Sequence, residues 1–185
     1  YADKAKDAID IGVYRGVYSY KLAQNYNIVH SFEPNPLLYP YLDRNLKKIA
    51  KNIKIYNLAL SNKDGEAALK LPLRSNSIFN DNIEELYQLG AASIHSKNQF
   101  DNFKEVMVKT KKLDDVKIIK KIGFIKIDVE GHETEVIEGA MSTIKANKPV
   151  LLVEIEQRHN KKPVEESISF INKIGYESFF LKNTE

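Results

Sequence analysis

One segment constrains the fold of this chain more than any other. Residues 124–127 form a short apolar run that passes directly into Asp-Val-Glu-Gly-His-Glu at residues 128–133, after which a helical pattern begins. In an open α/β sheet, ligands bind just beyond the carboxyl ends of the strands. A strand with this ending therefore places acid–base groups, and oxygen or nitrogen ligands for a metal, where such a sheet carries out chemistry. We interpret the chain as an enzyme.

The composition is that of an ordinary globular domain. Of the 185 residues, 43% are hydrophobic, and no apolar run approaches the roughly 20 residues that span a bilayer. We expect one domain over residues 1–185, without a membrane span or a signal peptide. The chain has no cysteine, which removes disulfides and thiolate chemistry and suits a cytoplasmic location. It begins with Tyr1, so we expect an excised or processed piece.

The charge pattern gives no indication of a nucleic-acid partner. The formal net charge is only +3, and lysines are interleaved with acidic residues through most of the chain. Two lysine-rich stretches, at residues 47–51 and 109–121, contain no interleaved aromatic residues on which bases could stack. We interpret both stretches as solvated faces.

Strand-like and helical patterns alternate along the chain, which is typical of βαβ units and a parallel sheet. Five strands are expected, at residues 8–12, 28–33, 53–60, 123–129 and 150–155. Apolar residues recur at helical spacing after each of them except the third, and a single stripe covers residues 136–144. The strand at 150–155 is nearly all apolar, as expected for a strand covered on both faces. The pattern predicts an α/β fold, a mostly parallel twisted sheet with helices on both faces.

The region after the third strand departs from this pattern. Residues 67–71 and 105–110 look like strands, and they flank a polar, irregular segment. Long irregular insertions in compact domains are commonly lids or binding loops. We therefore expect a substrate-side insertion at about residues 71–104.

A glycine loop follows the first strand. Two glycines, Gly12 and Gly16, stand four residues apart, and Asp10 precedes the first by two. A dinucleotide fingerprint would have three glycines and no acid that repels a pyrophosphate. S-adenosylmethionine carries an ammonium and a sulfonium group instead, and Glu33, at the end of the second strand, suits the two hydroxyls of its ribose. Alternatively, Asp10 caps a helix and Glu33 is a solvated strand end.

Four motifs, taken in order, resemble the FkbM-type methyltransferases, which are class I S-adenosylmethionine-dependent O-methyltransferases. These are Asp-x-Gly-x-x-x-Gly at residues 10–16, Phe-Glu-Pro-Asn-Pro at 32–36, Asn-Leu-Ala-Leu-Ser at 57–61 and Ile-Lys-Ile-Asp-Val-Glu-Gly-His-Glu at 125–133. The resemblance extends over nearly the whole chain. It implies a Rossmann-like class I methyltransferase fold with a seven-stranded sheet, six strands parallel and one antiparallel. Because the chain ends at Glu185, we expect the final strand to be short or missing.

The resemblance also implies a reaction and a cofactor site. The reaction would be methyl transfer from S-adenosylmethionine to a hydroxyl of a small-molecule or glycan acceptor, such as a sugar, a glycolipid or a secondary metabolite. The glycine loop would hold the methionine part, Glu33 the ribose, and Pro34 with residues 59–61 the adenine side. The predicted cofactor-binding residues are Asp10, Gly12, Val13, Tyr14, Arg15, Gly16, Glu33, Pro34, Ala59, Leu60, Ser61 and Asp128.

The predicted catalytic residues are His132, Asp128 and Glu130. A neutral alcohol is a poor nucleophile, so transfer to oxygen needs a base, a metal or close positioning. His132 is the natural base, because its ordinary pKa lies near physiological pH. Asp128 would orient it or hold the acceptor hydroxyl, and Glu130 could do either. The alternative is structural: His132 caps a helix, and the two carboxylates hold backbone amides.

Other functions would assign different roles to the same residues. Asp128 with Glu154 or Glu156 resembles an oxygen-only Mg²⁺ site, a less favoured alternative to a metal-free reaction. A nicotinamide-dependent oxidoreductase would use the same sheet but lacks its third glycine here. A non-catalytic S-adenosylmethionine-binding module would keep Asp10 and Glu33, and a pure interaction domain would explain the polar insertion alone. Of the other histidines, we expect His30 to be packed in the core.

Overall fold

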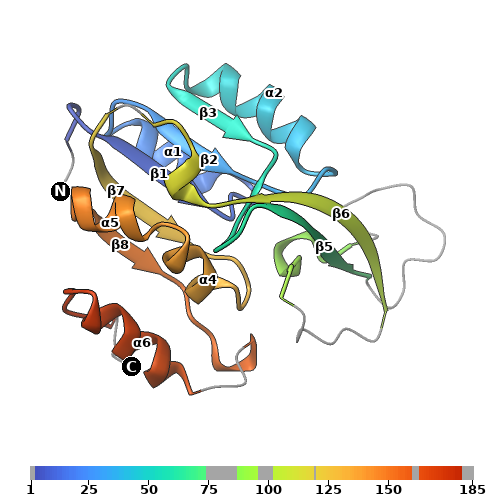
Figure 1. Ribbon diagram of the computed structural model, residues 1–185. Helices are drawn as coiled ribbons and strands as arrows, with labels where there is room; N and C mark the ends of the chain where they lie inside the picture. The colour runs from blue at the N-terminus through green and yellow to red at the C-terminus, as the bar shows by residue number, and fades with distance from the viewer. Residues whose placement is uncertain (1–2, 74–86, 96–101, 119, 160–162, 181–185) are drawn as a thin grey trace, which may run out of the picture.

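The central feature of the computed structural model is a parallel sheet. The structure describes residues 3–73, 87–95, 102–118, 120–159 and 163–180. Within them, five parallel strands lie in the order β3 (Ile53–Tyr56), β2 (Val29–Phe32), β1 (Asp7–Ile11), β7 (Ile122–Ile127) and β8 (Val150–Val153) (Figure 1). The direction of strand succession reverses between β1 and β7, and ligands bind outside the carboxyl ends at such a point. The predicted α/β Rossmann-like fold is confirmed.

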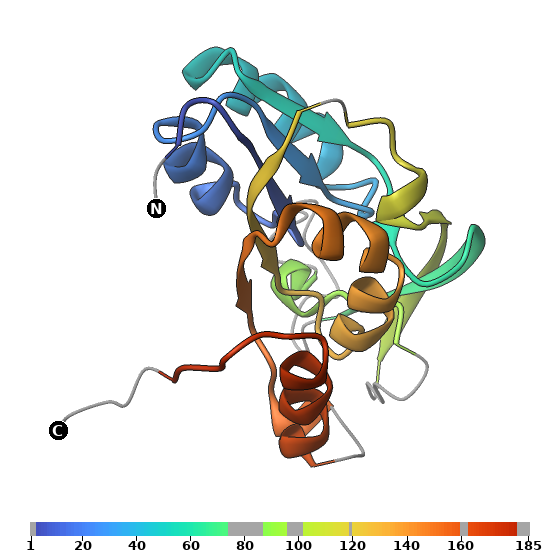
Figure 2. The ribbon, with the colours of Figure 1, turned by 60° about the vertical axis from the view of Figure 1, so that its left-hand side comes forward.

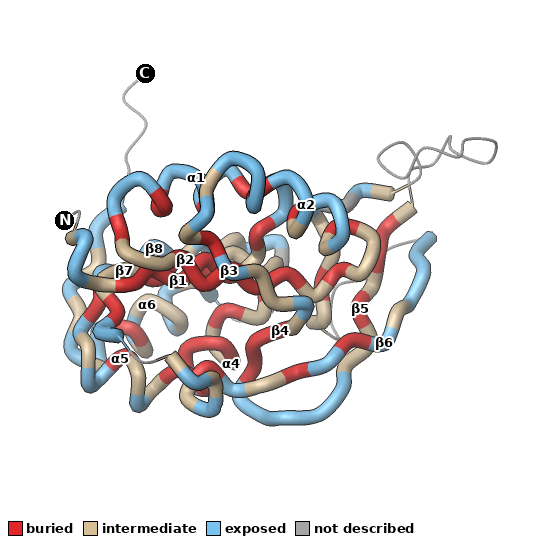
Figure 3. The backbone as a smooth tube through the Cα atoms, turned by 90° about the horizontal axis from the view of Figure 1, so that it is seen from above, coloured by how far each residue is buried: buried red, intermediate tan, exposed pale blue. Residues whose placement is uncertain are grey.

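Helices cover both faces of this sheet (Figure 3). One face carries α1 (Val17–Ala23) and α2 (Tyr39–Ile49), and the other carries α4 (Glu133–Glu138), α5 (Met141–Asn147) and α6 (Val164–Lys173). Buried apolar residues form one cluster with α1 and α2 and a second cluster with α4, α5 and α6. Among the described residues, no helix has the length and apolar character needed to cross a membrane.

The predicted third strand is two strands. Residues 53–60 divide into β3 and the two-residue β4 (Ala59–Leu60), which belongs to a different sheet. The break lies at Asn57, whose side-chain Nδ2 donates to the carbonyls of Glu33, at 2.9 Å, and Pro34, at 3.0 Å. These two bonds fix the chain to the end of β2 while its backbone turns out of the central sheet.

A second sheet projects from the central one (Figure 1). Its strand order is β4, β6 (Phe103–Lys111) and β5 (Gly65–Pro72), with β5 and β6 antiparallel. The strands expected at 67–71 and 105–110 are thus confirmed and are longer than predicted. Of the expected insertion at 71–104, the structure describes only residues 71–73, 87–95 and 102–104, including the short 3-10 helix η1 (Leu89–Ala91).

The single helical stripe expected at residues 136–144 is two helices, α4 and α5. They are separated at Gly139, where a Cβ would lie 1.9 Å from the carbonyl oxygen of Ser61. The end of α4 therefore packs directly on the backbone that follows β4. Gly139 has a helical φ of −74°, so this contact, rather than an unusual conformation, requires glycine.

The expectation that residues 150–155 are covered on both faces is wrong for the described chain. β8 is an edge strand there, and Val150 and Leu152 are 36% and 39% exposed. The reason is that α6 covers only one face of β8; in Figure 2, α6 (red) follows α4 and α5 (orange) at the β8 end of the sheet. Residues 176–180 form no strand.

Gly139→Ala should destabilise the fold, because the added methyl group would meet the Ser61 carbonyl and force the backbones apart. Overpacking of this kind costs about 1–3 kcal/mol of unfolding free energy. Urea unfolding followed by circular dichroism measures this loss, with Lys145→Ala, at an exposed position on the neighbouring helix, as the control. An unchanged midpoint for Gly139→Ala would contradict the close packing described here.

Candidate functional site

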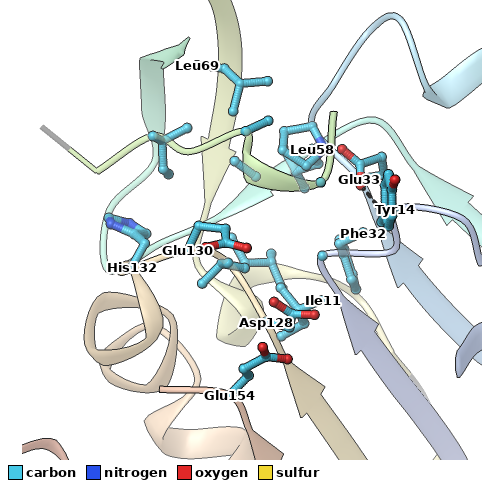
Figure 4. Close-up of a pocket in the computed structure, with 18 residues that line it drawn as sticks. Ile11, Tyr14, Phe32, Glu33, Leu58, Leu69, Asp128, Glu130, His132 and Glu154 are labelled. Atoms are coloured by element: carbon cyan, nitrogen blue, oxygen red, sulfur yellow. Dashed lines mark hydrogen bonds between the residues drawn. The ribbon is translucent and has the colours of Figure 1, made fainter. Parts of the chain in front are cut away.

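A cavity of about 250 Å³ lies at the carboxyl ends of the central strands (Figure 4). Its walls come from the loop after β1, the ends of β2 and β7, the β4 segment and the 90–94 part of the insertion. Figure 4 places Glu33 and Tyr14 at one end and His132 at the other, with Asp128 and Glu154 between them. This is the position that the strand order predicts for a ligand.

The cavity brings together most, though not all, of the residues expected from the sequence. The predicted residues that line it are Gly12, Tyr14, Glu33, Pro34, Ala59, Leu60, Asp128, Glu130 and His132. Those that do not line it are Asp10, Val13, Arg15, Gly16 and Ser61. Lining residues that the sequence did not single out are Ile11, Phe32, Leu58, Leu69, Gly90, Ala92, Ile94 and Val129. Leu58 stands inside a matched motif, whereas no local pattern marks residues 90–94.

The glycine loop makes a close backbone contact with the end of β7. Gly12 has a φ of +78°, and a Cβ there would lie 1.7 Å from the carbonyl oxygen of Asp128. The backbone amide of Asp128 donates to the Ile11 carbonyl at 3.1 Å, which holds the two segments together. Only glycine combines this conformation with this approach. The contact places the start of the loop and Asp128 on one cavity wall.

Glu33 is held in a fixed orientation. Its Oε2 accepts a hydrogen bond from the Tyr14 amide at 3.0 Å, and its Oε1 accepts one from the Asn35 amide at 2.9 Å. Burial raises the pKa of Glu33 to about 7, although these two amides act in the opposite direction. Each oxygen keeps a further lone pair, so the carboxylate can still accept hydrogen bonds from a ligand.

Asp10 lies beneath the glycine loop, away from the cavity. It is fully buried, and its Oδ2 accepts a hydrogen bond from Ser19 Oγ at 2.6 Å. Burial raises its pKa, and the Lys126 ammonium, 3.5 Å from Oδ1, opposes that shift. The structure therefore does not bring the Asp10 side chain to the position expected for contact with a ligand. Strand alternation agrees with this, because successive side chains point to opposite faces and the neighbouring Ile11 lines the cavity.

The other loop residues that miss the cavity have packing contacts instead. Val13 is buried in the cluster beneath α1 and α2, and Gly16 lies against the Leu46 side chain of α2. The Arg15 guanidinium lies 5.4 Å from the centre of the Tyr14 ring. Of the loop residues 12–16, only Gly12 and Tyr14 therefore line the cavity.

The end of β7 has an unusual backbone conformation. Glu130 has a φ of +54°, which is uncommon for a residue with a side chain and typical of functional sites when it occurs. Its carbonyl accepts a hydrogen bond from Ser93 Oγ of the insertion at 2.8 Å. Burial, followed by the negative charge of Asp128, raises the pKa of the half-buried Glu130 carboxyl to about 7.

His132 is held by residues outside the cavity. Its Nε2 lies 2.9 Å from Ser61 Oγ, and its Nδ1 lies 3.7 Å from a Glu135 oxygen on α4. Burial lowers its pKa. Ser61, expected on the adenine side, instead fixes this imidazole. The ring of His95 stands edge-on to it, with 6.5 Å between the centres, so the insertion also reaches this end of the site.

Acidic residues border the β7 and β8 ends without forming a recognisable metal centre. Asp128, Glu130, Glu133, Glu154 and Glu156 line one small hollow. Within the described ranges, however, no group of three or more His, Cys, Asp or Glu side chains is arranged to hold a metal ion. The charge of Asp128 raises the pKa of Glu154, as expected for carboxylates that crowd one another.

His30 has the core position expected for it. It is 3% exposed, with Nε2 at 3.1 Å from Asp7 Oδ2 and Nδ1 at 3.0 Å from Tyr56 Oη. This histidine therefore joins β1, β2 and β3 and takes no part in the cavity.

Comparisons with known proteins agree with this geometry. No curated protein matches the chain. A crystal structure of methyltransferase FkbM from Methylobacillus flagellatus KT is similar in fold, with a TM-score of 0.60 and 15% sequence identity. The match covers 92% of this chain but 38% of that protein, so the chain spans less than two fifths of its length. The model of the methyltransferase FkbM domain matches residues 10–178, and the chain therefore belongs to the FkbM methyltransferase family.

Proposed function

We propose that this protein is an S-adenosylmethionine-dependent O-methyltransferase that acts on a hydroxyl group of a small molecule, such as a sugar, a glycolipid or a secondary metabolite. One observation carries the cofactor assignment. Among the described residues that line the cavity, four are carboxylic acids and none is lysine or arginine. Such a wall favours a cationic ligand and disfavours a pyrophosphate.

The residues present fit this cofactor. Glu33 is a buried, oriented acceptor for the two ribose hydroxyls, and Gly12 lines the cavity beside Asp128. Pro34, Leu58 and Ala59 supply apolar surface beside Glu33 for the adenine. The same wall argues against a nicotinamide dinucleotide, whose phosphates would meet carboxylates instead of a helix N-terminus or a basic side chain.

Glu130 is the general base in this proposal. The bound cofactor supplies an electrophilic methyl group on sulfonium sulfur, so the protein must remove a proton from the acceptor oxygen. Glu130 lies on the cavity wall with a pKa of about 7, close to the value at which a base works best near neutral pH. His132 is the weaker candidate, because Ser61 occupies its Nε2 and its Nδ1 is buried beside Glu135. Asp128 is then free to bind the acceptor hydroxyl or the cofactor.

Methyl transfer itself is the direct test of this function. The protein is incubated with S-adenosylmethionine carrying a labelled methyl group and with panels of hydroxyl, amine and carboxylate acceptors, each with and without EDTA. We expect label to pass to hydroxyl acceptors, with rates unaffected by EDTA. Transfer to amines alone would contradict the O-methyltransferase assignment, and loss of transfer in EDTA that Mg²⁺ restores would favour the metal alternative.

Glu130→Gln should lower kcat by about 10²–10⁴-fold and leave the affinity for S-adenosylhomocysteine unchanged. A base must be deprotonated to act, so the wild-type rate should rise as the pH passes through about 7, the pKa of Glu130. This rise should be absent in Glu130→Gln and present in His132→Gln. The measurement is a pH–rate profile of kcat for the three proteins on one acceptor, at saturating S-adenosylmethionine, so that protonation of Glu33 does not contribute through cofactor binding. A rise that persists in Glu130→Gln and disappears in His132→Gln would assign the base to His132.

Binding of S-adenosylhomocysteine should weaken as the pH falls below about 7, because protonation of Glu33 removes an acceptor for the ribose hydroxyls. Glu33→Gln should bind about 10–100-fold more weakly at pH 8, and with less dependence on pH, because hydrogen bonds to a charged group are the strong ones. Isothermal titration from pH 5.5 to 8.5 measures both effects. The control is Glu66→Gln, an exposed position on β5. Equal affinities of Glu33→Gln and wild type would remove Glu33 from the cofactor site.

A further inference from the structure

Lys126 is a charged side chain in the interior of the central sheet. It belongs to β7, which pairs with β1 on one side and β8 on the other, and it is only 5% exposed. Lysine is almost never fully buried unless it is paired. An apolar residue would fill such a strand position at lower cost, so the charge calls for an explanation from its contacts.

The contacts of Lys126 converge on the floor of the cavity. Its Nζ donates to the Gly12 carbonyl at 2.7 Å and lies 3.1 Å from Asp128 Oδ2. It also lies 3.5 Å from Asp10 Oδ1, and 5.1 Å from the centre of the Tyr18 ring on α1. One ammonium group thus joins the glycine loop, the residue beneath it, the end of β7 and the first helix.

Lys126 does not line the cavity, whereas two of its partners, Gly12 and Asp128, do. These two residues meet where a Cβ on Gly12 would lie 1.7 Å from the Asp128 carbonyl oxygen. Lys126 lies at this junction and binds the Gly12 backbone and the Asp128 side chain at once. Its charge also acts as a counterion to the acidic wall, because it opposes the rise in pKa of the nearby Glu33 and Glu154 carboxyls.

We propose that Lys126 is a positioning residue for methyl transfer: it holds the Gly12 carbonyl and the Asp128 carboxylate in one fixed arrangement and balances the negative charge of the cofactor cavity. This inference rests on the proposed function, since the arrangement matters only if the cavity binds the cofactor. Lys126 acts through Gly12 and Asp128 and touches neither the cofactor nor the acceptor.

The test removes the charge without leaving Asp10 buried and unpaired. Lys126→Met alone would leave the buried Asp10 carboxylate without a counterion, which is strongly destabilising. The double variant Lys126→Met/Asp10→Asn is therefore compared with Asp10→Asn alone. Both variants retain a polar partner for Ser19, and they differ in the contacts of Lys126, chiefly those to Gly12 and Asp128 and also those to the Tyr18 ring and residue 10. Lys54→Met, an exposed lysine on β3, is the matched control for the substitution.

Two measurements are made on these proteins. In the absence of ligand, hydrogen exchange of the peptides covering residues 11–16 and 127–131 should be faster in the double variant than in Asp10→Asn. Isothermal titration with S-adenosylhomocysteine should give about tenfold weaker binding by the double variant, with the pH midpoint of binding moved upward. The upward shift is expected because loss of the ammonium raises the pKa of Glu33, and a purely structural lysine would not produce it.

The outcomes separate the two proposals. Equal exchange, affinity and pH midpoint in the double variant and Asp10→Asn would overturn the positioning role. A double variant that unfolds while Asp10→Asn stays folded would also overturn it, since Lys126 would then support the sheet as a whole. If the wild-type protein binds no S-adenosylhomocysteine, the proposed function fails and the positioning role fails with it, even if exchange in the loop responds.

Discussion

The site depends on one contact, the backbone approach of Gly12 to Asp128. Gly12 directly follows β1 and Asp128 directly follows the neighbouring β7, and a Cβ at Gly12 would lie 1.7 Å from the Asp128 carbonyl oxygen. Two hydrogen bonds hold this contact: the Asp128 amide donates to the Ile11 carbonyl, and the Lys126 ammonium donates to the Gly12 carbonyl. The loops after β1 and β7 thereby become one wall. Glu33 faces that wall from the end of β2, and Glu130 continues it toward His132.

The electrostatics of this wall follow from its carboxyl groups and their burial. Four carboxyl groups line the cavity, and burial raises the pKa of two of them, Glu33 and Glu130, to about 7. Ionising the buried carboxyl groups of such a cavity costs free energy when the cavity is empty. A bound cation lowers that cost, because an opposite charge favours the ionised form. Lys126 supplies part of the balancing charge from behind the wall, where it does not compete with a ligand. The fold thus leaves the cavity suited to a sulfonium or ammonium group.

Much of the fold and part of the site could be predicted from the sequence, because the signals are local. Strand ends are marked by a change from apolar to polar residues, and the glycines of the first loop indicate a turn. Gly12, Glu33 and Asp128, which these signals single out as binding residues, all line the cavity. The division of residues 53–60 at Asn57 depends on hydrogen bonds to a distant strand end, which no local pattern encodes.

Side-chain direction was harder to predict than position. Asp10 and Ser61 occupy the expected places in the chain, yet one points beneath the loop and the other toward His132. In the sequence, Lys126 is an interruption of an apolar strand. Its hydrogen bond to the Gly12 carbonyl, 114 residues away in sequence, is seen only in the structure. Residues 90–94 close the cavity through contacts made by an insertion whose composition carries no periodic signal. Burial and long-range pairing decide these cases.

We expect the acidic cavity of this sheet to bind an adenosyl sulfonium cofactor rather than a dinucleotide. Isothermal titration of the wild-type protein at pH 8 with S-adenosylhomocysteine, and separately with NADH, tests it most directly. We expect saturable, one-to-one binding of S-adenosylhomocysteine in the micromolar range and no heat of binding for NADH. Binding of NADH alone, or of neither compound, would contradict it.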